Sequence, residues 1–429
     1  MSRSNVHGLR RALQIILLAG CSLASAQSAG DLSALDLESA DDIQAVAAAP
    51  SHLTIELALG NDRRRFDLAT QDTARASIDW VYRQKLGAGT RLVVSDRIDF
   101  LRPHDARGGE HLVNSLREAY VGWTDEEGNL ALDFGRVNIR SGPAYGYNPT
   151  DFFRGGSLRS MPTADPVALR ANRMGTVVLR AQSLWRNGSL TVNLSPELRD
   201  GPSTDPWSLD LGSTNAADRA LVTLATQWSD RLNTQLHVFK QAGSPVQLGA
   251  SGSVLVSDAV VAYAELTSSR EPAPPVAAML GNGSRRRGER VSAGLTYTTP
   301  GKLSITAELQ YNAHALADAQ WDRAALVAPR GLAAYVADAL WRQDLAGRRG
   351  YLIYVSQRDL VIKNLHLTAF VQTNAHDRSR LSWLELRRQW TALEAAVQLQ
   401  YQSAGRGGAS EFGLAPNRAS LAVLAGYRF

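Results

Sequence analysis

The sequence predicts an all-β fold, a transmembrane antiparallel up-and-down β-barrel of 18 strands, with 16 strands as the alternative. Three observations predict this fold. From residue 51 onward, apolar and polar side chains alternate in segments of about ten residues, the length that a tilted strand needs to cross a bilayer. Tyr, Trp and Phe recur near the segment ends, as in the aromatic girdles of membrane barrels. Short and long connections alternate along the chain, which is typical of barrels with short periplasmic turns and long outer loops.

Composition excludes several other classes of protein. The chain has 429 residues, 46 basic and 41 acidic side chains, a formal net charge of +5 and one cysteine, Cys21. A single cysteine excludes a disulfide framework and a thiolate metal cage. The mean hydropathy of -0.19 is too low for a bundle of membrane-spanning helices. The small, dispersed net charge does not indicate nucleic-acid binding.

The first 26 residues are predicted to be an export signal. Arginines flank a short apolar run at 12–19, and Ala24-Ser25-Ala26 has the small-x-small form that signal peptidase cleaves. Leu18-Ala19-Gly20-Cys21 offers an alternative, because it resembles a bacterial lipobox that would make Cys21 a lipidated N-terminus. Residues 27–50 then form a short acidic periplasmic tail or one weak helix, and residues 51–429 form a single barrel domain.

The connections define the strands in chain order. The clearest hairpin joins residues 291–298 to residues 303–311 and has one apolar and one polar face. Strands at 53–60 and 247–256 carry the weakest alternation. Short turns are predicted at 85–89, 124–129, 186–188, 229–232, 257–258, 299–302, 358–362 and 388–389, and long loops at 61–74, 101–114, 137–173, 197–218, 242–246, 270–288, 313–349, 374–379 and 403–417.

The C-terminal strand alternates over the last twelve residues and ends on two aromatic side chains, Tyr427 and Phe429. A terminal aromatic that closes an alternating strand resembles the assembly signal of bacterial outer-membrane barrels, which implies a partner in the barrel assembly machinery. A closed barrel leaves no backbone N–H or C=O unpaired in hydrocarbon, where each would cost several kcal/mol. With 16 to 18 strands, side chains of the wall cannot fill the lumen, so a channel is expected.

The loop at 137–173 is the most informative connection. It is rich in glycine and aromatic residues, and Asn148-Pro149 favours a turn. A Gly-Arg strand end at 135–136, followed by this stretch and by Asn148-Pro149-Thr150-Asp151, resembles a group of large bacterial porin-like barrels that includes relatives of alginate exporters. Phe152 and Phe153 are too apolar for a solvated loop, so we expect the segment to fold back into the barrel mouth.

The charges of this loop predict a constriction of the pore. Its basic residues far outnumber its acids, so an inward fold would narrow the lumen and favour anions. The alternative is a surface loop whose arginines pair with acids of neighbouring loops. The residues assigned to the constriction are Arg140, Asp151, Arg154, Arg159, Arg170 and Arg173.

Strand parity adds candidates on the lumen wall. If Ile78 and Tyr82 face lipid, alternate residues face the lumen. The same parity places Asp96 on the lipid face, where we expect a bulge or a shift of register. The wall residues predicted to line the solute path are Arg83, Arg97, Arg180, Glu308 and His366, with Asp79, Arg91, Asp133, His237 and Glu394 as further inward-facing side chains.

Two other loops carry specific predictions. Residues 317–327 and 332–345 have helical periodicity and an apolar side, so the loop at 313–349 is either a small extracellular cap or a plug of the lumen. The loop at 270–288 contains three prolines and then Arg285-Arg286-Arg287, which predicts an exposed basic tip near lipopolysaccharide phosphates.

The predicted function is a channel in the bacterial outer membrane for passive diffusion of small polar or anionic solutes. Two alternatives stay open: export of an acidic polysaccharide, and a plugged barrel that binds or supports without conducting. No His-Glu-x-x-His, P-loop or Gly-x-Ser-x-Gly pattern is present. We therefore expect neither an enzyme nor a cofactor or metal. Membrane lipid, lipopolysaccharide and a small-molecule or polysaccharide solute are the expected partners, whereas the solute, the direction of transport and the oligomeric state are left open.

Overall fold

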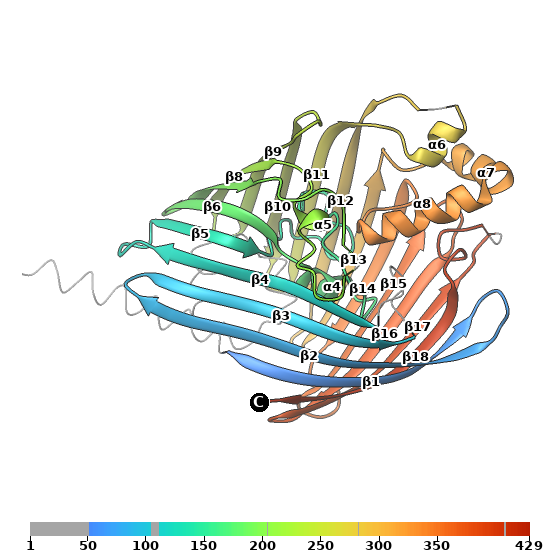
Figure 1. Cartoon of the computed structure of the whole chain (residues 1–429), viewed down its shortest axis with the longest axis horizontal. Helices are drawn as coiled ribbons and strands as arrows, with labels where there is room; N and C mark the ends of the chain where they lie inside the picture. Colours follow the sequence, from blue (N-terminus) through green and yellow to red (C-terminus); the bar gives the residue numbers. More distant parts are fainter. Residues whose placement is uncertain (1–50, 104–110, 204, 282, 407–408) are drawn as a thin grey trace, which may run out of the picture.

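The computed structural model describes residues 51–103, 111–203, 205–281, 283–406 and 409–429. The predicted export signal, its alternative lipidation site Cys21 and the predicted tail at 27–50 lie outside the described residues. Within them, one sheet of 18 antiparallel strands closes on itself, which confirms the predicted strand number and excludes the alternative of 16 (Figure 1). Both weakly alternating segments, 53–60 and 247–256, lie in strands.

Each strand pairs with its neighbours in sequence, so the barrel is of the up-and-down type. The strands are β1 (His52–Arg64), β2 (Thr70–Gly87), β3 (Thr90–Arg102), β4 (Leu112–Thr124), β5 (Leu130–Val137), β6 (Thr176–Trp185), β7 (Gly188–Ser195), β8 (Arg219–Ser229), β9 (Leu232–Gln241), β10 (Gln247–Ser257), β11 (Val260–Glu271), β12 (Arg286–Thr298), β13 (Leu303–Asn312), β14 (Arg349–Gln357), β15 (Leu365–Asn374), β16 (Arg380–Gln389), β17 (Leu393–Ser403) and β18 (Asn417–Arg428).

The first and last strands close the barrel. β1 pairs with β18 along its length, from Thr54 opposite Arg428 to Arg64 opposite Asn417. The backbone N–H of Phe429 donates to the carbonyl of Leu53 at 2.9 Å and extends the seam to the end of the chain. Because β1 also pairs with β2, the hydrogen-bonded ring is continuous and has no open edge.

Short and long connections lie at opposite ends of the barrel. The connections that leave even-numbered strands are short and lie at the end of the barrel that also holds the C-terminus (Figure 1). The connections that leave odd-numbered strands lie at the other end and include the long segments and the helices. These are called the short-turn end and the long-loop end below. This arrangement agrees with the predicted alternation of turns and loops.

The wall has an apolar outer face and a polar inner face. Outward side chains such as Leu59, Phe134 and Val423 are exposed, although they are large and apolar. Inward side chains such as Gln182 and Ser292 are buried inside the barrel. This is the reverse of a water-soluble protein and follows directly from the two-residue period of a strand.

A bulge interrupts the wall where parity placed Asp96 on the lipid face. The pairing of β3 with β4 shifts register between Ser95 and Asp96, so that Arg117 becomes an extra residue on β4. The expected bulge is therefore present. Asp96 is nevertheless buried, and its carboxylate accepts the backbone N–H of Arg97 at 2.8 Å.

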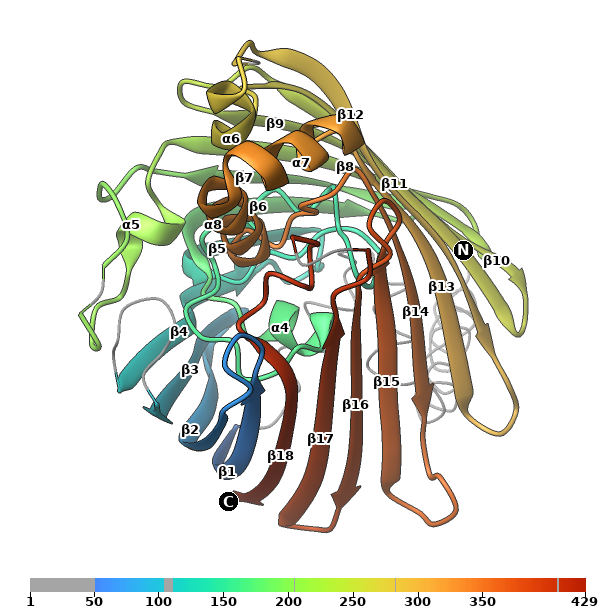
Figure 2. The same cartoon turned by 90° about the vertical axis from the view of Figure 1, so that its right-hand side faces the viewer.

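The loop at 313–349 forms two helices, α7 (Asp318–Val327) and α8 (Pro329–Trp341), as its periodicity predicts. α8 begins three residues earlier than expected, because Pro329 occupies its first turn, where the missing N–H has no cost. Both helices lie at the long-loop rim beside α6 (Pro275–Met279), as Figure 2 shows. No helix in the described part of the chain is long and apolar enough to cross a membrane.

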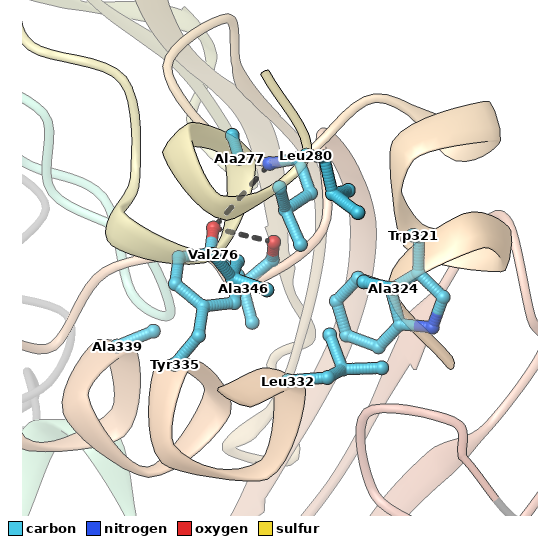
Figure 3. Packing of buried hydrophobic residues seen from close by; sticks show 10 residues of the cluster. Val276, Ala277, Leu280, Trp321, Ala324, Leu332, Tyr335, Ala339 and Ala346 are labelled. Atoms are coloured by element: carbon cyan, nitrogen blue, oxygen red, sulfur yellow. Dashed lines mark hydrogen bonds between the residues drawn. The ribbon is translucent and has the colours of Figure 1, made fainter. Parts of the chain in front are cut away.

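A small apolar core holds these helices together (Figure 3). Trp321 of α7, Leu332 of α8 and Val276 of α6 belong to this core, and the Tyr335 hydroxyl donates to the carbonyl of Ala346 at 2.8 Å. The loop at 270–288 is thus only partly the exposed tip that its prolines suggest. Apolar residues of α6 pack this part of the loop against α7 and α8. The helices α6, α7 and α8 are together called the cap below.

The last long loop, between β17 and β18, closes around a partly buried carboxylate. Glu411 accepts a hydrogen bond from the side-chain amide of Asn374 at 2.6 Å, and its own backbone N–H donates to Asp377 at 2.7 Å. Burial raises the pKa of Glu411 from its ordinary value of 4.5 to about 7, and the nearby charge of Asp377 adds to the rise.

A carboxyl group with a raised pKa in the folded state stabilises the loop least when it is ionised. We therefore expect the loop at 409–416 to be most stable below about pH 4.5 and to lose stability as the pH rises to about 7. Glu411→Gln should remove this loss. Hydrogen exchange of these amides, compared between wild type and variant at matched pH, should show a difference that grows from acid to neutral pH.

The matched control is Glu126→Gln, at an exposed glutamate in the turn between β4 and β5. It should leave exchange of the 409–416 loop unchanged at every pH. A wild-type loop that is equally protected at acid and neutral pH would contradict the assignment of Glu411 as the titrating group.

Candidate pore constriction

The segment at 137–173 turns into the barrel, as its aromatic residues predicted. Its short helix α4 (Pro166–Ala171) lies inside the ring of strands when the barrel is viewed from the long-loop end (Figure 2). The segment contacts inner-face residues of strands far apart around the wall, including Asp99 of β3, Glu265 of β11 and Glu308 of β13. It therefore crosses the lumen. This segment is called the inner loop below.

Glu308 on the inner face of β13 holds the first half of the inner loop. Its carboxylate accepts the backbone N–H groups of Tyr145 at 2.8 Å, Gly146 at 3.2 Å and Tyr147 at 3.0 Å. The Tyr263 hydroxyl donates to the same carboxylate at 2.9 Å. Successive N–H groups that converge on one anion form a strong, directional anchor, because hydrogen bonds to a charged acceptor are stronger than neutral ones.

Glu265 on β11 provides a second anchor of the same kind. It accepts the backbone N–H of Ala144 at 2.8 Å, the backbone N–H of Thr150 at 3.0 Å and the hydroxyl of Thr150 at 2.7 Å. Gly142 approaches this carboxylate so closely that a Cβ there would lie 2.3 Å from it, and its φ of +85° also favours glycine. The two anchors together fix residues 144–150.

Aromatic packing fixes the second half of the inner loop. The Phe152 ring stacks on Phe239 of β9 with centroids 4.9 Å apart, and Phe153 meets the same ring edge-on at 6.0 Å. Five strands farther around the wall, the Tyr145 ring lies 5.3 Å from Tyr354 of β14. These contacts bury the apolar residues that would otherwise be exposed to water in the lumen.

Most charged residues of the inner loop are engaged by the protein itself. Asp151 is buried and forms salt bridges with Arg173 at 2.7 Å and with Arg170 at 3.5 Å. Arg154 donates to the carbonyl of Asn148 at 2.7 Å. Arg159 donates to backbone carbonyls of residues 205 and 208. These groups fasten the inner loop to itself and to its neighbours, so the inward fold does not leave them free for solute.

Asp344 links the inner loop to the cap. Its carboxylate accepts the Tyr147 hydroxyl at 2.8 Å and lies 3.5 Å from both Arg154 and Arg290. Burial alone would raise the pKa of Asp344, but the charges of Arg290 and Arg154 outweigh it and hold the pKa at about 2. The link therefore stays ionised over the whole physiological range.

A polar cavity of about 340 Å³ remains between the inner loop and the short-turn end. Its walls come from the ends of β1, β2, β17 and β18 and from the middle of β3 and β4, and the inner loop closes it on one side with Asn138, Arg140 and Ala171. The lining residues are His52, Thr54, Glu56, Asp79, Val81, Arg83, Ser95, Arg97, Arg117, Glu118, Asn138, Arg140, Ala171, Glu394 and Arg428.

Two of the five arginines of this cavity are fastened to acids of the wall. Arg117 donates through both terminal nitrogens to Asp79, at 2.5 and 2.8 Å. Arg97 contacts Asp99 at 2.9 Å and Glu56 at 3.0 Å. Both guanidinium groups are thus oriented and partly neutralised.

The other three arginines of the cavity are Arg83, Arg140 and Arg428, and none forms a salt bridge with a described residue. Glu394 on the same wall is drawn to Arg387 at 2.7 Å. Glu118 also lines the cavity, and its charge interacts with those of Arg140 and Arg83 without forming a salt bridge. The cavity therefore presents three guanidinium groups that hold no salt bridge and have one acid nearby. This is the arrangement that attracts an anionic solute.

The predicted wall residues divide between the cavity and the rest of the lumen. Arg83 and Arg97 line the cavity, and Glu308 anchors the inner loop instead. Arg180 lies opposite Asp133 in the pairing of β5 with β6, outside the cavity lining. His366 lies near the short-turn end of β15, also outside it.

Reasoning from sequence missed several residues of this site, among them Arg117, Glu265 and Arg428. Arg117 is the extra residue of the β4 bulge, so parity could not place it. Glu265 alternates with outward residues of β11, so parity could have placed it on the inner face. Parity could not have shown that it binds the inner loop. Arg428 lies on the inner face by the parity of β18, but its place at the end of the chain gave no sign that it lines the path.

The described residues, which omit 1–50 and short stretches at 104–110, 204, 282 and 407–408, hold no group of His, Cys, Asp and Glu side chains suited to a metal ion. The barrel thus combines an apolar outer face, a polar lumen and an inward loop, and this combination defines the porin-like class of outer-membrane channels.

Comparisons with solved structures agree with this class. The fold is similar to that of Acinetobacter baumannii OccAB1, with a TM-score of 0.56 and 10% identity over 88% of this chain and 96% of that chain. It is also similar to Pseudomonas aeruginosa OccK11 (OpdR), with a TM-score of 0.52 and 10% identity over 88% and 96%. No family model and no curated protein matches the sequence. The fold is that of bacterial outer-membrane porins.

The two anchors predict how the inner loop responds to mutation. Glu308→Ala leaves three backbone N–H groups of residues 145–147 without their acceptor. Each buried donor that finds no other hydrogen-bond partner costs about 1 to 3 kcal/mol of stability. We expect the barrel to assemble but the inner loop to loosen. Limited proteolysis should cleave within 137–173 faster than in wild type, and single-channel recordings should become noisier.

The control for this prediction is Asp133→Asn, which alters a lumen-facing carboxylate that contacts Arg91 and not the inner loop. It should leave both cleavage and channel noise as in wild type. Equal protease resistance of the inner loop in Glu308→Ala and in wild type would show that Glu308 does not hold it.

Proposed function

We propose that the protein is an outer-membrane channel for passive diffusion of small polar or anionic solutes, and that the inner loop constricts it. The observation that carries the proposal is the cavity beneath the inner loop, where Arg83, Arg140 and Arg428 lack salt bridges with described residues. A guanidinium group binds carboxylate or phosphate through paired hydrogen bonds. In a narrow passage little water remains to screen its charge, so its effect on a passing anion is larger than at the surface.

The layout of the lumen supports this route. The anchors and aromatic residues of the inner loop are packed against β8, β9, β11, β13 and β14, and the loop also contacts Arg75 of β2 and Asp99 of β3. The cavity lies on the side of β1, β2, β17 and β18. A solute that passes the inner loop would therefore move along the arginine-bearing wall and leave beside Arg428 at the periplasmic end.

Two partners follow from the same placement. We infer that the barrel assembly machinery reads the C-terminal aromatics, because Tyr427 and Phe429 are exposed and their rings meet edge-on at 4.6 Å. We also infer that lipopolysaccharide phosphates contact Arg285 and Arg287, which are exposed at the extracellular end. Arg286 is partly withdrawn from this tip, because it donates to the carbonyls of Ala313 and Ala315.

The test of the channel is the conductance of the purified protein in planar lipid bilayers. Discrete current steps are expected. An absence of channels from correctly folded protein would overturn the proposal and favour a barrel that does not conduct.

Selectivity should depend on the arginines of the cavity. Arg83→Gln together with Arg140→Gln keeps hydrogen-bonding side chains and removes two charges, so the anion-over-cation permeability ratio should fall. A unit charge about 4 Å from an ion contributes about 1 kcal/mol even at the dielectric constant of water, which corresponds to a several-fold change. Reversal potentials in a salt gradient measure the ratio, and the effect should shrink at high salt.

The matched control is Arg285→Gln with Arg287→Gln on the outer loop, which should change the ratio much less. A larger shift of the permeability ratio from the outer pair than from the cavity pair would show that the selective charges lie on the outer loop and not in the cavity. Arg154 and Arg159 hold backbone carbonyls, so their part in selectivity stays a prediction that the same measurement tests.

Assembly should depend on the terminal aromatic. If the assembly machinery reads Phe429, its deletion should lower the amount of protein in the outer membrane and leave the assembled molecules with normal conductance. Arg428→Gln, on the inner face of the same strand, should leave the amount unchanged. Immunoblots of outer-membrane fractions decide, and equal levels of both variants and wild type would make the aromatic terminus incidental to assembly.

A further inference from the structure

The outer wall carries a groove that the channel function does not explain. It has a volume of about 640 Å³ and crosses the outward faces of β14 to β18 and β1. Two neighbouring rows of outward side chains form it, each row running through one residue of every strand. One row is Ile353, Val371, Ser382, Tyr401, Ala419 and Arg63, and the other is Val355, Ala369, Leu384, Leu399, Leu421 and Asn61.

The groove descends from the extracellular rim into the membrane. Arg63 is the last but one residue of β1, at its extracellular end, whereas Ile353 lies in the middle of β14. With strands about 4.8 Å apart, five strand spacings give a length of about 24 Å. The groove therefore begins at the level of lipid headgroups and ends at the level of acyl chains.

The chemistry of the groove changes along the same direction. The end at β14 is lined by aliphatic side chains, and the small residues Ala369 and Ala419 leave space between the larger ones. The end at β1 and β18 is cationic. Arg63 is exposed and forms no salt bridge with a described residue, and Arg418 lies over the Tyr401 ring at 5.8 Å and donates to its hydroxyl at 3.3 Å.

Few acids offset these charges. Asp72 on the neighbouring strand β2 forms no salt bridge with Arg63. Its carboxylate instead accepts a hydrogen bond from the side-chain amide of Asn61 at 2.9 Å. Arg64, next in sequence, is paired with Asp67 at 3.2 Å. Two guanidinium groups therefore stay available at the head of an apolar groove.

We propose that this groove binds one molecule of a phosphate-bearing, multiply acylated lipid of the outer leaflet, of the lipid A class. A headgroup phosphate would accept hydrogen bonds from Arg63 and Arg418, because guanidinium groups match the geometry of phosphate. One acyl chain would lie over Ala369 and Ala419, where each buried methylene adds to binding. The hydroxyl of Tyr401 lies at the boundary between the two parts, as is usual for tyrosine at a membrane interface.

The alternative occupant is a second copy of this chain. The gradient from charged rim to apolar interior favours the lipid, since it matches the polarity of one amphipathic molecule lying along the groove. An apolar interface with another barrel would not be stabilised by unpaired arginines at one end of the groove.

The test measures lipid binding to the purified full barrel in detergent by native mass spectrometry. The probes are bis-phosphorylated lipid A, its dephosphorylated form and phosphatidylglycerol. Ala369→Trp fills the groove and should lower the affinity for lipid A about tenfold. Ala425→Trp is the control, because Ala425 is also outward-facing but lies outside the groove, near the periplasmic end of β18.

A second pair of variants tests the headgroup. Arg63→Gln with Arg418→Gln should weaken binding of phosphorylated lipid A more than of the dephosphorylated form, whereas Arg186→Gln in a periplasmic turn should weaken neither. Three results would overturn the proposal. The first is an equal loss of lipid A affinity in the two tryptophan variants. The second is equal affinity of the wild-type barrel for phosphatidylglycerol and lipid A. The third is an Ala369→Trp variant that converts an oligomer to monomers but still binds lipid A as the wild type does.

Discussion

The pairing of β1 with β18 is the interaction on which the rest of the structure depends. In hydrocarbon an unpaired backbone N–H or C=O costs several kcal/mol, so a sheet in the membrane is stable only when its two edges meet. The register from Thr54 opposite Arg428 to Arg64 opposite Asn417 satisfies both edges. Once the ring is closed, strand parity separates the side chains into an apolar outer face and a polar lumen.

A ring of this size leaves a lumen that its own wall cannot fill. The inner loop occupies much of it, and two wall carboxylates hold that loop through its backbone. Glu308 and Glu265 accept five backbone N–H groups of residues 144–150 between them. The shape of the passage is thus set by main-chain geometry, while the side chains of Arg83 and Arg140 remain available to act on the solute.

Much of the fold could be predicted from the sequence, because a two-residue period is a local property of each strand. The inward turn of 137–173 was also predictable, since Phe152 and Phe153 have no stable place in water. The anchors were not, because they join residues more than one hundred positions apart, as between Glu265 and Ala144. The same limit explains Arg159, whose surplus charge suggested a solute contact but whose guanidinium binds carbonyls of another loop. Arg117 was hidden by a bulge that breaks the period.

The central claim is that ions pass the inner loop beside Arg140. The only cysteine of the chain, Cys21, lies in the predicted export signal, so a single thiol can be introduced and modified selectively once that signal is removed. The most direct measurement is the single-channel conductance of Arg140→Cys before and after reaction with a negatively charged methanethiosulfonate, with Arg186→Cys as the control. The account predicts a drop in anion current for the first variant and none for the second. Complete labelling of Cys at position 140 without any change in current would contradict it.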